Sequence, residues 1–170
     1  TAELIEALND PRVRFHNLAE RKKTYPANAR FHWYAGGANP CNESLRRARG
    51  VWIARIDDDD IWTEDHLEVL LDFAVARDVE FVSGCYESVR FDERTVVCGN
   101  EAYGSYFGKL KSDQADQGPK IGGVSTWLYR SYLRFMKYNE FCWRKRCNKV
   151  WDVDLAARFI DAGVTMAHLP

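Results

Sequence analysis

The stretch of sequence that decides the fold is VWIARIDDDDIW, at residues 51–62. Its first half is almost continuously apolar, which predicts a strand that is buried on both faces of a helix-covered sheet. Four consecutive aspartates, Asp57 to Asp60, follow at the expected end of this strand. Because carboxylates this close repel one another, we expect a cation or a donor-rich ligand to offset their charge. The stretch therefore predicts an anionic, metal-dependent site at a strand end, where open α/β sheets bind their ligands.

Helix capping offers a simpler explanation of the same aspartates. Thr63 starts a helix signal, and an aspartate just before a helix commonly caps its first turn. A cap uses one side chain and leaves the other three unexplained, so we favour a functional cluster. An EF-hand calcium loop is excluded, because the segment lacks the glycine and the distal glutamate of such loops.

The segments around this stretch alternate between helical and extended patterns, which predicts an α/β fold. Helices are expected at residues 1–8, 42–49 and 152–162, with a further helix that turns Leu67, Leu70, Leu71 and Ala74 inward. Strands are expected at residues 12–16, 51–56, 80–85 and 164–169, with a hairpin over residues 86–98. Residues 19–39 are expected to form a loop, and the glycine-containing residues 99–123 a mobile loop over a site.

The length and net charge of the chain limit the classes of protein to which it can belong. A chain of 170 residues with 46% hydrophobic content can bury one sizeable core, and nothing in it requires a second domain. The net charge of −1 gives no case for a general nucleic-acid or membrane-surface partner. No apolar stretch approaches the length of a membrane span, and the start of the chain lacks the regions of a signal peptide.

The cysteines indicate the compartment. There are five of them, an odd count, and no two are spaced as a CxxC pair. This pattern argues against a complete disulfide framework and against a zinc ribbon. We therefore expect a cytoplasmic location, with the membrane face as an option through segments outside this sequence.

Four segments in order resemble family 2 glycosyltransferases, which have the GT-A fold. Residues 50–62 and the helical segment that follows resemble the DxD region of that family. Asn42 followed by Ala48-Arg49-Gly50 is similar to its asparagine-helix-AxG segment, residues 122–130 are similar to its acceptor-side strand, and residues 151–155 to the start of its ED-containing helix. The resemblance implies one GT-A-like domain over residues 1–170, with a mixed, mostly parallel sheet flanked by helices.

The sequence departs from the family pattern at three places. Trp151 stands where the family usually has glutamate, and Arg55 stands where an apolar residue is usual. The chain also starts just after the position of the family's first strand, helix and second strand. The resemblance therefore implies an N-terminally incomplete domain in which half of the nucleotide pocket is absent from the sequence.

The resemblance assigns roles to the acidic residues. Asp57 is expected to contact the ribose or base of a nucleotide-sugar, with Asn42 also on the donor side. Asp59 is expected to ligate a divalent cation, Mn²⁺ or Mg²⁺, that bridges the diphosphate. Asp60 is expected to orient a neighbour or accept a sugar hydroxyl. Asp58 is expected to point away, because alternate residues of an extended segment face opposite sides.

The C-terminal part of the chain supplies two further candidates. Asp152 matches the aspartate of the family's ED pair, which acts as general base on the acceptor hydroxyl. A plain alternative is that Asp152 and Asp154 only stabilise a helix N-terminus through its dipole, and the local sequence does not separate the two explanations. His168 is a secondary candidate, because a C-terminal histidine completes the metal shell in some GT-A enzymes.

Together these features predict an inverting, metal-dependent glycosyltransferase. Its partners would be a nucleotide-sugar donor, with a UDP-sugar favoured, and a carbohydrate or glycoconjugate acceptor in cell-surface polysaccharide or glycoconjugate synthesis. One alternative is a phosphotransferase of the haloacid-dehalogenase type, which also places a DxD at a strand end. A second alternative is a degenerate GT-A domain that only binds carbohydrate or protein.

Overall fold

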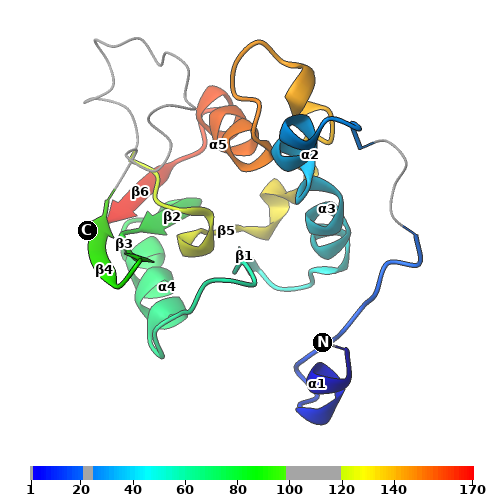
Figure 1. The fold of residues 1–170 in the computed structure, drawn as a ribbon. Helices are drawn as coiled ribbons and strands as arrows, with labels where there is room; N and C mark the ends of the chain where they lie inside the picture. The colour runs from blue at the N-terminus through cyan, green and yellow to red at the C-terminus, as the bar shows by residue number, and fades with distance from the viewer. Residues whose placement is uncertain (1, 21–24, 99–119) are drawn as a thin grey trace.

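A four-stranded mixed sheet forms the centre of the computed structural model, which describes residues 2–20, 25–98 and 120–170 (Figure 1). The strand order is β1-β5-β2-β6. The strands are β1 (Trp52–Ala54), β2 (Phe81–Gly84), β5 (Leu128–Arg130) and β6 (Met166–Leu169). Strand β5 is antiparallel to both β1 and β2, and β2 is parallel to β6. The predicted mixed sheet is confirmed, but in the described residues parallel pairing is confined to β2 and β6.

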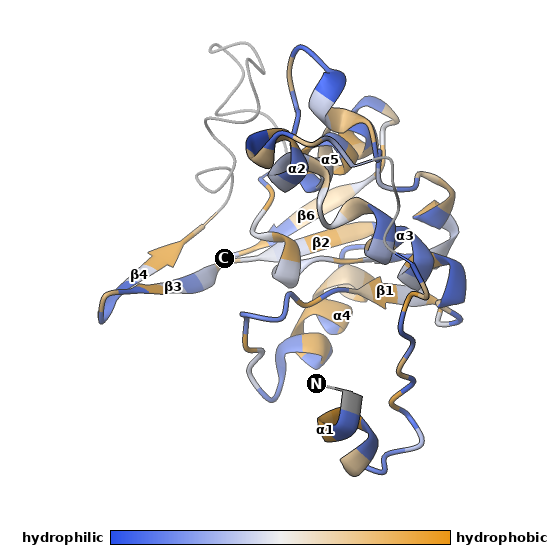
Figure 2. Cartoon of the chain, turned by 45° about the vertical axis from the view of Figure 1, so that its right-hand side comes forward, coloured by the Kyte–Doolittle hydropathy of each residue, from blue (hydrophilic) through white to orange (hydrophobic). Residues whose placement is uncertain are grey.

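Helices cover both faces of this sheet, as Figures 1 and 2 show. The covering helices are α2 (Ala29–Ala35), α3 (Ala38–Arg47), α4 (His66–Ala76) and α5 (Trp151–Asp161), whereas α1 (Ala2–Ala7) lies apart from the sheet. Successive strand residues point to opposite faces, so Val82 and Leu128 pack against α4 while Phe81 and Tyr129 face α2, α3 and α5. Two apolar clusters, one on each face, therefore hold the sheet between layers of helix.

Aromatic side chains fill the larger of the two clusters. The ring of Phe81 lies 5.4 Å from that of Trp127, 5.9 Å from Phe159 and 6.3 Å from Tyr129. All four are essentially buried, and pairs at these separations add about 0.5 to 1.5 kcal/mol beyond the burial of their surface. These buried aromatic contacts hold α5 against the sheet. The first turn of α5 carries Trp151 and Asp152.

Shorter elements complete the described chain. A hairpin of β3 (Tyr86–Arg90) and β4 (Glu93–Val97) projects from the body (Figure 2). Its turn lies at Phe91 and Asp92, which both have positive φ angles. Three 3₁₀ turns are η2 (Val124–Thr126), η3 (Ser131–Phe135) and η4 (Cys142–Arg144). No helix among the described residues is long and apolar enough to cross a bilayer.

Two predictions for the first forty residues are wrong. Residues 12–16 form no strand, because no other strand pairs with them and Val13 and Phe15 are each 44% exposed. Residues 19–39 are not all loop, since they contain α2 and the start of α3. The signal for α2 was a cap: the Asn28 side chain accepts hydrogen bonds from the backbone N–H groups of Arg30 and Phe31.

Smaller differences concern helix faces and ends. Helix α3 begins four residues before the predicted start and ends at Arg47, so Gly50 does not terminate it. On α4 only the predicted Leu70 and Ala74 are buried, while Leu67 and Leu71 are exposed. In β1, Ile53 is buried in the larger cluster, while Trp52 and Ala54 are only partly buried against the smaller one, so the expected burial on both faces is confirmed in part. The predicted elements at residues 1–8, 80–85, 86–98, 152–162 and 164–169 are confirmed to within a few residues, and residues 99–119 of the expected mobile loop lie outside the described chain.

Candidate active site

The segment after β1 is held against η2 by one serine. The backbone N–H of Asp57 donates to Ser125 Oγ at 3.0 Å, and the indole N–H of Trp62 donates to the Ser125 carbonyl at 2.7 Å. The ring of Trp62 also stacks on His66, with centroids 4.9 Å apart at the start of α4. Both ends of the acidic loop are thus fixed to the body, which confines the aspartates between them to a small volume.

Three of the four aspartates converge. One carboxylate oxygen from each of Asp57, Asp59 and Asp60 lies within 4.8 Å of the others. Two charges at that separation repel by about 1 to 3 kcal/mol, depending on the effective dielectric constant. Asp58 is exposed and does not belong to this cluster, as expected, but the reason is a turn and not the alternation of an extended segment: the Asp60 N–H donates to the Asp57 carbonyl at 3.3 Å, and Asp60 joins the cluster. The cluster offers only oxygen ligands, which is the donor set that Mg²⁺ and Mn²⁺ prefer.

The positive charge of Arg55 partly neutralises the negative charge of the aspartate cluster. Its guanidinium pairs with the Asp57 carboxylate and lies over the ring of Trp151, 4.0 Å from the ring centroid. The Arg55 side chain is only 16% exposed, and its Nη1 is buried without a hydrogen-bond partner in the described chain. A buried donor without a partner is costly and therefore uncommon in folded proteins.

Asp152 lies in the first turn of α5, near enough to Arg55 and Asp57 for their charges to shift its pKa. Burial raises the pKa of its carboxyl, while a backbone hydrogen bond and the charge of Arg55 lower it. Burial also raises the pKa of Asp57, and the Arg55 charge opposes that rise. The negative charge of Asp57 in turn raises the pKa of Asp152. The predicted donor-side and acceptor-side carboxylates therefore interact electrostatically with each other and with Arg55.

Asp154 has a different role from Asp152. It is fully buried and pairs with Lys145 at 2.6 Å and with Arg158 at 2.8 Å. Arg158 in turn donates to the backbone carbonyls of Met136 and Lys137. Asp154 is therefore part of the framework that holds α5 to the preceding loop.

The Asn42 side chain is engaged at both ends by the backbone of Tyr138. Its amide donates to the Tyr138 carbonyl at 2.9 Å, and its oxygen accepts from the Tyr138 N–H at 2.8 Å. This pairing ties α3 to the segment between η3 and η4. The expected contact of Asn42 with the nucleotide stays a prediction, and the structure gives its amide a framework role.

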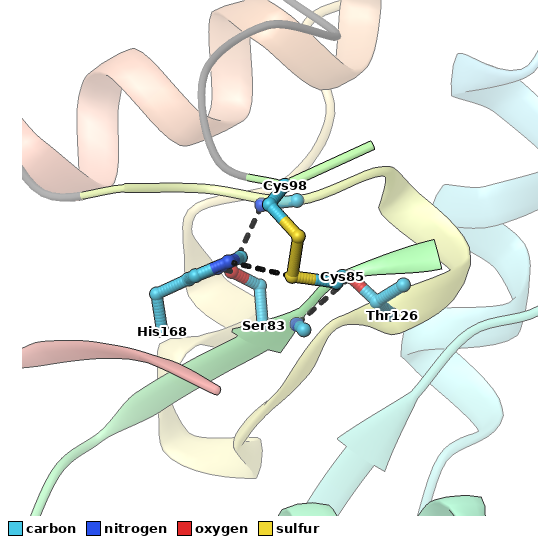
Figure 3. The surroundings of a disulfide bond; sticks show 7 residues. Ser83, Cys85, Cys98, Thr126 and His168 are labelled. Atoms are coloured by element: carbon cyan, nitrogen blue, oxygen red, sulfur yellow. Dashed lines mark hydrogen bonds between the residues drawn. A yellow bond between two sulfur atoms is a disulfide. The ribbon is translucent and has the colours of Figure 1, made fainter. Parts of the chain in front are cut away.

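His168 is not part of the aspartate cluster. Its ring lies beside Cys85 and Cys98, which form a disulfide (Figure 3). Neither this disulfide nor the contact between Arg55 and Trp151 was predicted from the sequence. Gly37 packs against the same Trp151 ring: a Cβ there would lie 2.3 Å from the ring, so this position admits only glycine.

A comparison with protein-family models now adds to this geometry. The model described as glycosyl transferase family 2 matches residues 29–155, which is most of the chain. The chain belongs to glycosyl transferase family 2. The matched range includes the aspartate cluster, Arg55 and Asp152, whereas His168 lies beyond it. A comparison with curated proteins gave no match.

Membership settles the coarse properties of the domain. The family has the GT-A fold, and the mixed sheet with helices on both faces agrees with it. The family also supports glycosyl transfer, with a nucleotide-sugar donor and an acceptor as partners. The roles of individual residues rest on the geometry described above.

Proposed function

We propose that this domain transfers a sugar, with inversion, from a nucleotide-sugar to an acceptor hydroxyl in a metal-dependent reaction. The observation that carries the proposal is the convergence of Asp57, Asp59 and Asp60 within 4.8 Å at the end of β1. Strand ends of this kind are where open α/β sheets bind ligands. A UDP-sugar is the favoured donor, and assembly of a cell-surface polysaccharide or glycoconjugate the favoured setting.

The cluster fits a divalent cation. Asp59 and Asp60 are exposed, so a hydrated cation can reach both, while Asp57 is half-buried and already paired with Arg55. We assign Asp59 as the protein ligand, Asp57 to the ribose or base, and Asp60 to a supporting contact. When bound, the cation supplies Lewis-acid stabilisation of the negative charge on the leaving diphosphate.

Asp152 is the proposed general base. It would accept the proton of the acceptor hydroxyl as that oxygen attacks the anomeric carbon, and the bond from this carbon to the nucleoside diphosphate would break in the same step. Its carboxyl is partly buried on α5, a helix that the aromatic core fixes in place. A base held in this way is positioned before the acceptor arrives, which lowers the entropic part of the barrier.

The test measures donor binding. We expect UDP with Mn²⁺ to raise the melting temperature, whereas UDP or Mn²⁺ alone gives little change. Asp59→Asn should abolish this stabilisation, and the matched variant Asp58→Asn should retain it, because Asp58 lies outside the cluster. Equal binding by the two variants contradicts the assignment of Asp59.

The same preparation separates the alternatives. Release of phosphate from a phosphomonoester would favour the phosphotransferase. An absence of any response to nucleotide with metal would favour a binding module, for which the tryptophan at position 151 is the structural argument.

A further inference from the structure

Cys85, Cys98 and His168 bring three metal-ligating side chains together from three separate elements. Cys85 follows β2, Cys98 follows β4, and His168 lies in β6. One ligand atom from each lies within 4.8 Å of the others. Strands β2 and β6 are parallel neighbours with Ser83 opposite His168, so the sheet itself fixes the histidine beside Cys85 (Figure 3).

The distance between nitrogen and sulfur matches that of a metal site. His168 Nε2 lies 3.6 Å from Cys85 Sγ. Two ligands at the usual Zn–N and Zn–S distances in a tetrahedral site are separated by about 3.6 Å. The histidine therefore already has the spacing from Cys85 that a shared zinc ion requires.

The other ring nitrogen of His168 is held by a buried side chain. Its Nδ1 lies 3.2 Å from Ser83 Oγ, and that oxygen also accepts a hydrogen bond from the Gly122 N–H at 2.9 Å. Ser83 is fully buried. Histidines that bind metals are usually oriented by a partner on the second nitrogen in just this way.

We propose that Cys85, Cys98 and His168 bind Zn²⁺ when the disulfide between the two cysteines is reduced. Reduction by a dithiol breaks the S–S bond, gives two protein thiols and leaves the reductant as its own disulfide. Binding of Zn²⁺ then releases the two thiol protons, so that two thiolates and the neutral imidazole Nε2 ligate the ion. Water occupies the fourth position of the tetrahedron.

The two candidate metal sites differ in chemistry. The aspartate cluster offers hard oxygen ligands, whereas this one offers two soft sulfurs and an imidazole, a set that selects zinc and similar ions over Mg²⁺ or Mn²⁺. The zinc site does not depend on the proposed glycosyl transfer. In a reducing compartment the site would be open to metal, and in an oxidising one the disulfide would close it.

Cobalt provides a direct probe, because Co²⁺ bound to thiolates absorbs in the near ultraviolet and Co²⁺ bound to carboxylates does not. The chain is reduced with a phosphine, freed of reductant without oxygen, and titrated with Co²⁺. We expect thiolate-to-cobalt absorption that saturates at a single equivalent and disappears when Zn²⁺ is added. The oxidised chain should show none.

Variants identify the ligands. Cys85→Ser, Cys98→Ser and His168→Ala should each weaken Co²⁺ binding at least tenfold, and the two serine variants should also lose absorption. Cys147→Ser is the matched control, because Cys147 is an exposed free cysteine outside the cluster. Asp59→Asn should leave the absorption unchanged, which separates this site from the donor site.

Three results would overturn the proposal. The first is a reduced, folded chain without thiolate-to-cobalt absorption. The second is a loss of binding in Cys147→Ser as large as that in Cys85→Ser. The third is a chain that unfolds on reduction, seen by circular dichroism, and does not refold when Co²⁺ is added.

Discussion

The guanidinium of Arg55 lies over the indole of Trp151, 4.0 Å from the ring centroid. These are the two residues that depart from the family pattern at the site, and the structure brings them into contact. A cation over a tryptophan face contributes about 0.5 to 2 kcal/mol, with the larger values where the pair is desolvated, as here. The ring packs on Gly37, and Arg55 interacts electrostatically with both Asp57 and Asp152. The two departures therefore form one unit beside the aspartates that we assign to the donor and to the acceptor.

Replacing Arg55 should shift the pH dependence of activity. Burial raises the pKa of Asp152, and the positive charge of Arg55 opposes that rise. A general base must be ionised, so activity is lost as the pH falls through its pKa. Without the Arg55 charge this pKa rises further, so the acid limb of kcat/KM in Arg55→Gln should lie at higher pH than in the wild type.

Arg130→Gln is the control for that measurement. Arg130 also lies over a tryptophan ring, 4.1 Å from the centroid of Trp52, but at the opposite end of β1 from Asp57. In the pH profile of kcat/KM for Arg130→Gln, the acid limb should lie at the same pH as in the wild type. An unchanged limb in Arg55→Gln, or an equal shift in both variants, would contradict the electrostatic role of Arg55.

Asp152→Asn should separate binding from chemistry. The asparagine amide has nearly the same shape as the carboxylate, but it cannot take up the proton of the acceptor hydroxyl. We therefore expect kcat to fall by about 10² to 10⁴. Stabilisation by UDP with Mn²⁺ should remain close to wild type, because Asp152 is not a member of the aspartate cluster. Asp161→Asn, an exposed aspartate at the other end of α5, is the control and should keep full turnover. Wild-type turnover in Asp152→Asn would exclude it as the base.

Gly37→Ala should destabilise the fold through Trp151. An added Cβ would lie 2.3 to 2.8 Å from three atoms of an indole that is 9% exposed, so the ring or α3 must move. Overpacking of this kind costs about 1 to 3 kcal/mol, measured as a lower free energy of unfolding in urea. In the double variant Gly37→Ala/Trp151→Leu the clash is absent, so the loss should be smaller than the sum of the single losses. Additive losses would show that the ring does not cause the effect.

Periodic, locally encoded elements were predictable from the sequence. Helix α5 begins within one residue of its predicted start, and Gly163 ends it with a φ of 73°, because inward apolar positions and a terminal glycine are local signals. Strand β2, flanked by β5 and β6, lies within the strand predicted at residues 80–85 and is buried at every position. The aspartate cluster was also predictable, since its members are adjacent in the chain.

Features that depend on contacts between distant segments were not predictable. Residues 12–16 have the alternating pattern of a strand. A strand also needs a neighbouring strand to pair with, and the local sequence does not show whether one is present. The contact of Arg55 with Trp151 joins residues far apart in the chain, and the pattern of β1 gave no reason to place an arginine against α5. The amide of Asn42 matched a donor-side motif, yet its hydrogen bonds to Tyr138 arise only from the tertiary fold.

Asp154→Asn should lower stability without involving the reaction. The carboxylate is fully buried between Lys145 and Arg158, which are 37% and 29% exposed, so its loss leaves two half-buried cations without their partner. Removing one member of a buried ion pair costs about 3 kcal/mol or more. We expect a drop of that size in the free energy of unfolding, measured with urea. Glu43→Gln is the control: Glu43 pairs with Arg46 and Arg47 on the surface of α3, where solvent screening leaves an ion pair little effect on stability. Equal losses in the two variants would contradict the framework role of Asp154, which holds Arg158 against the backbone of Met136 and Lys137.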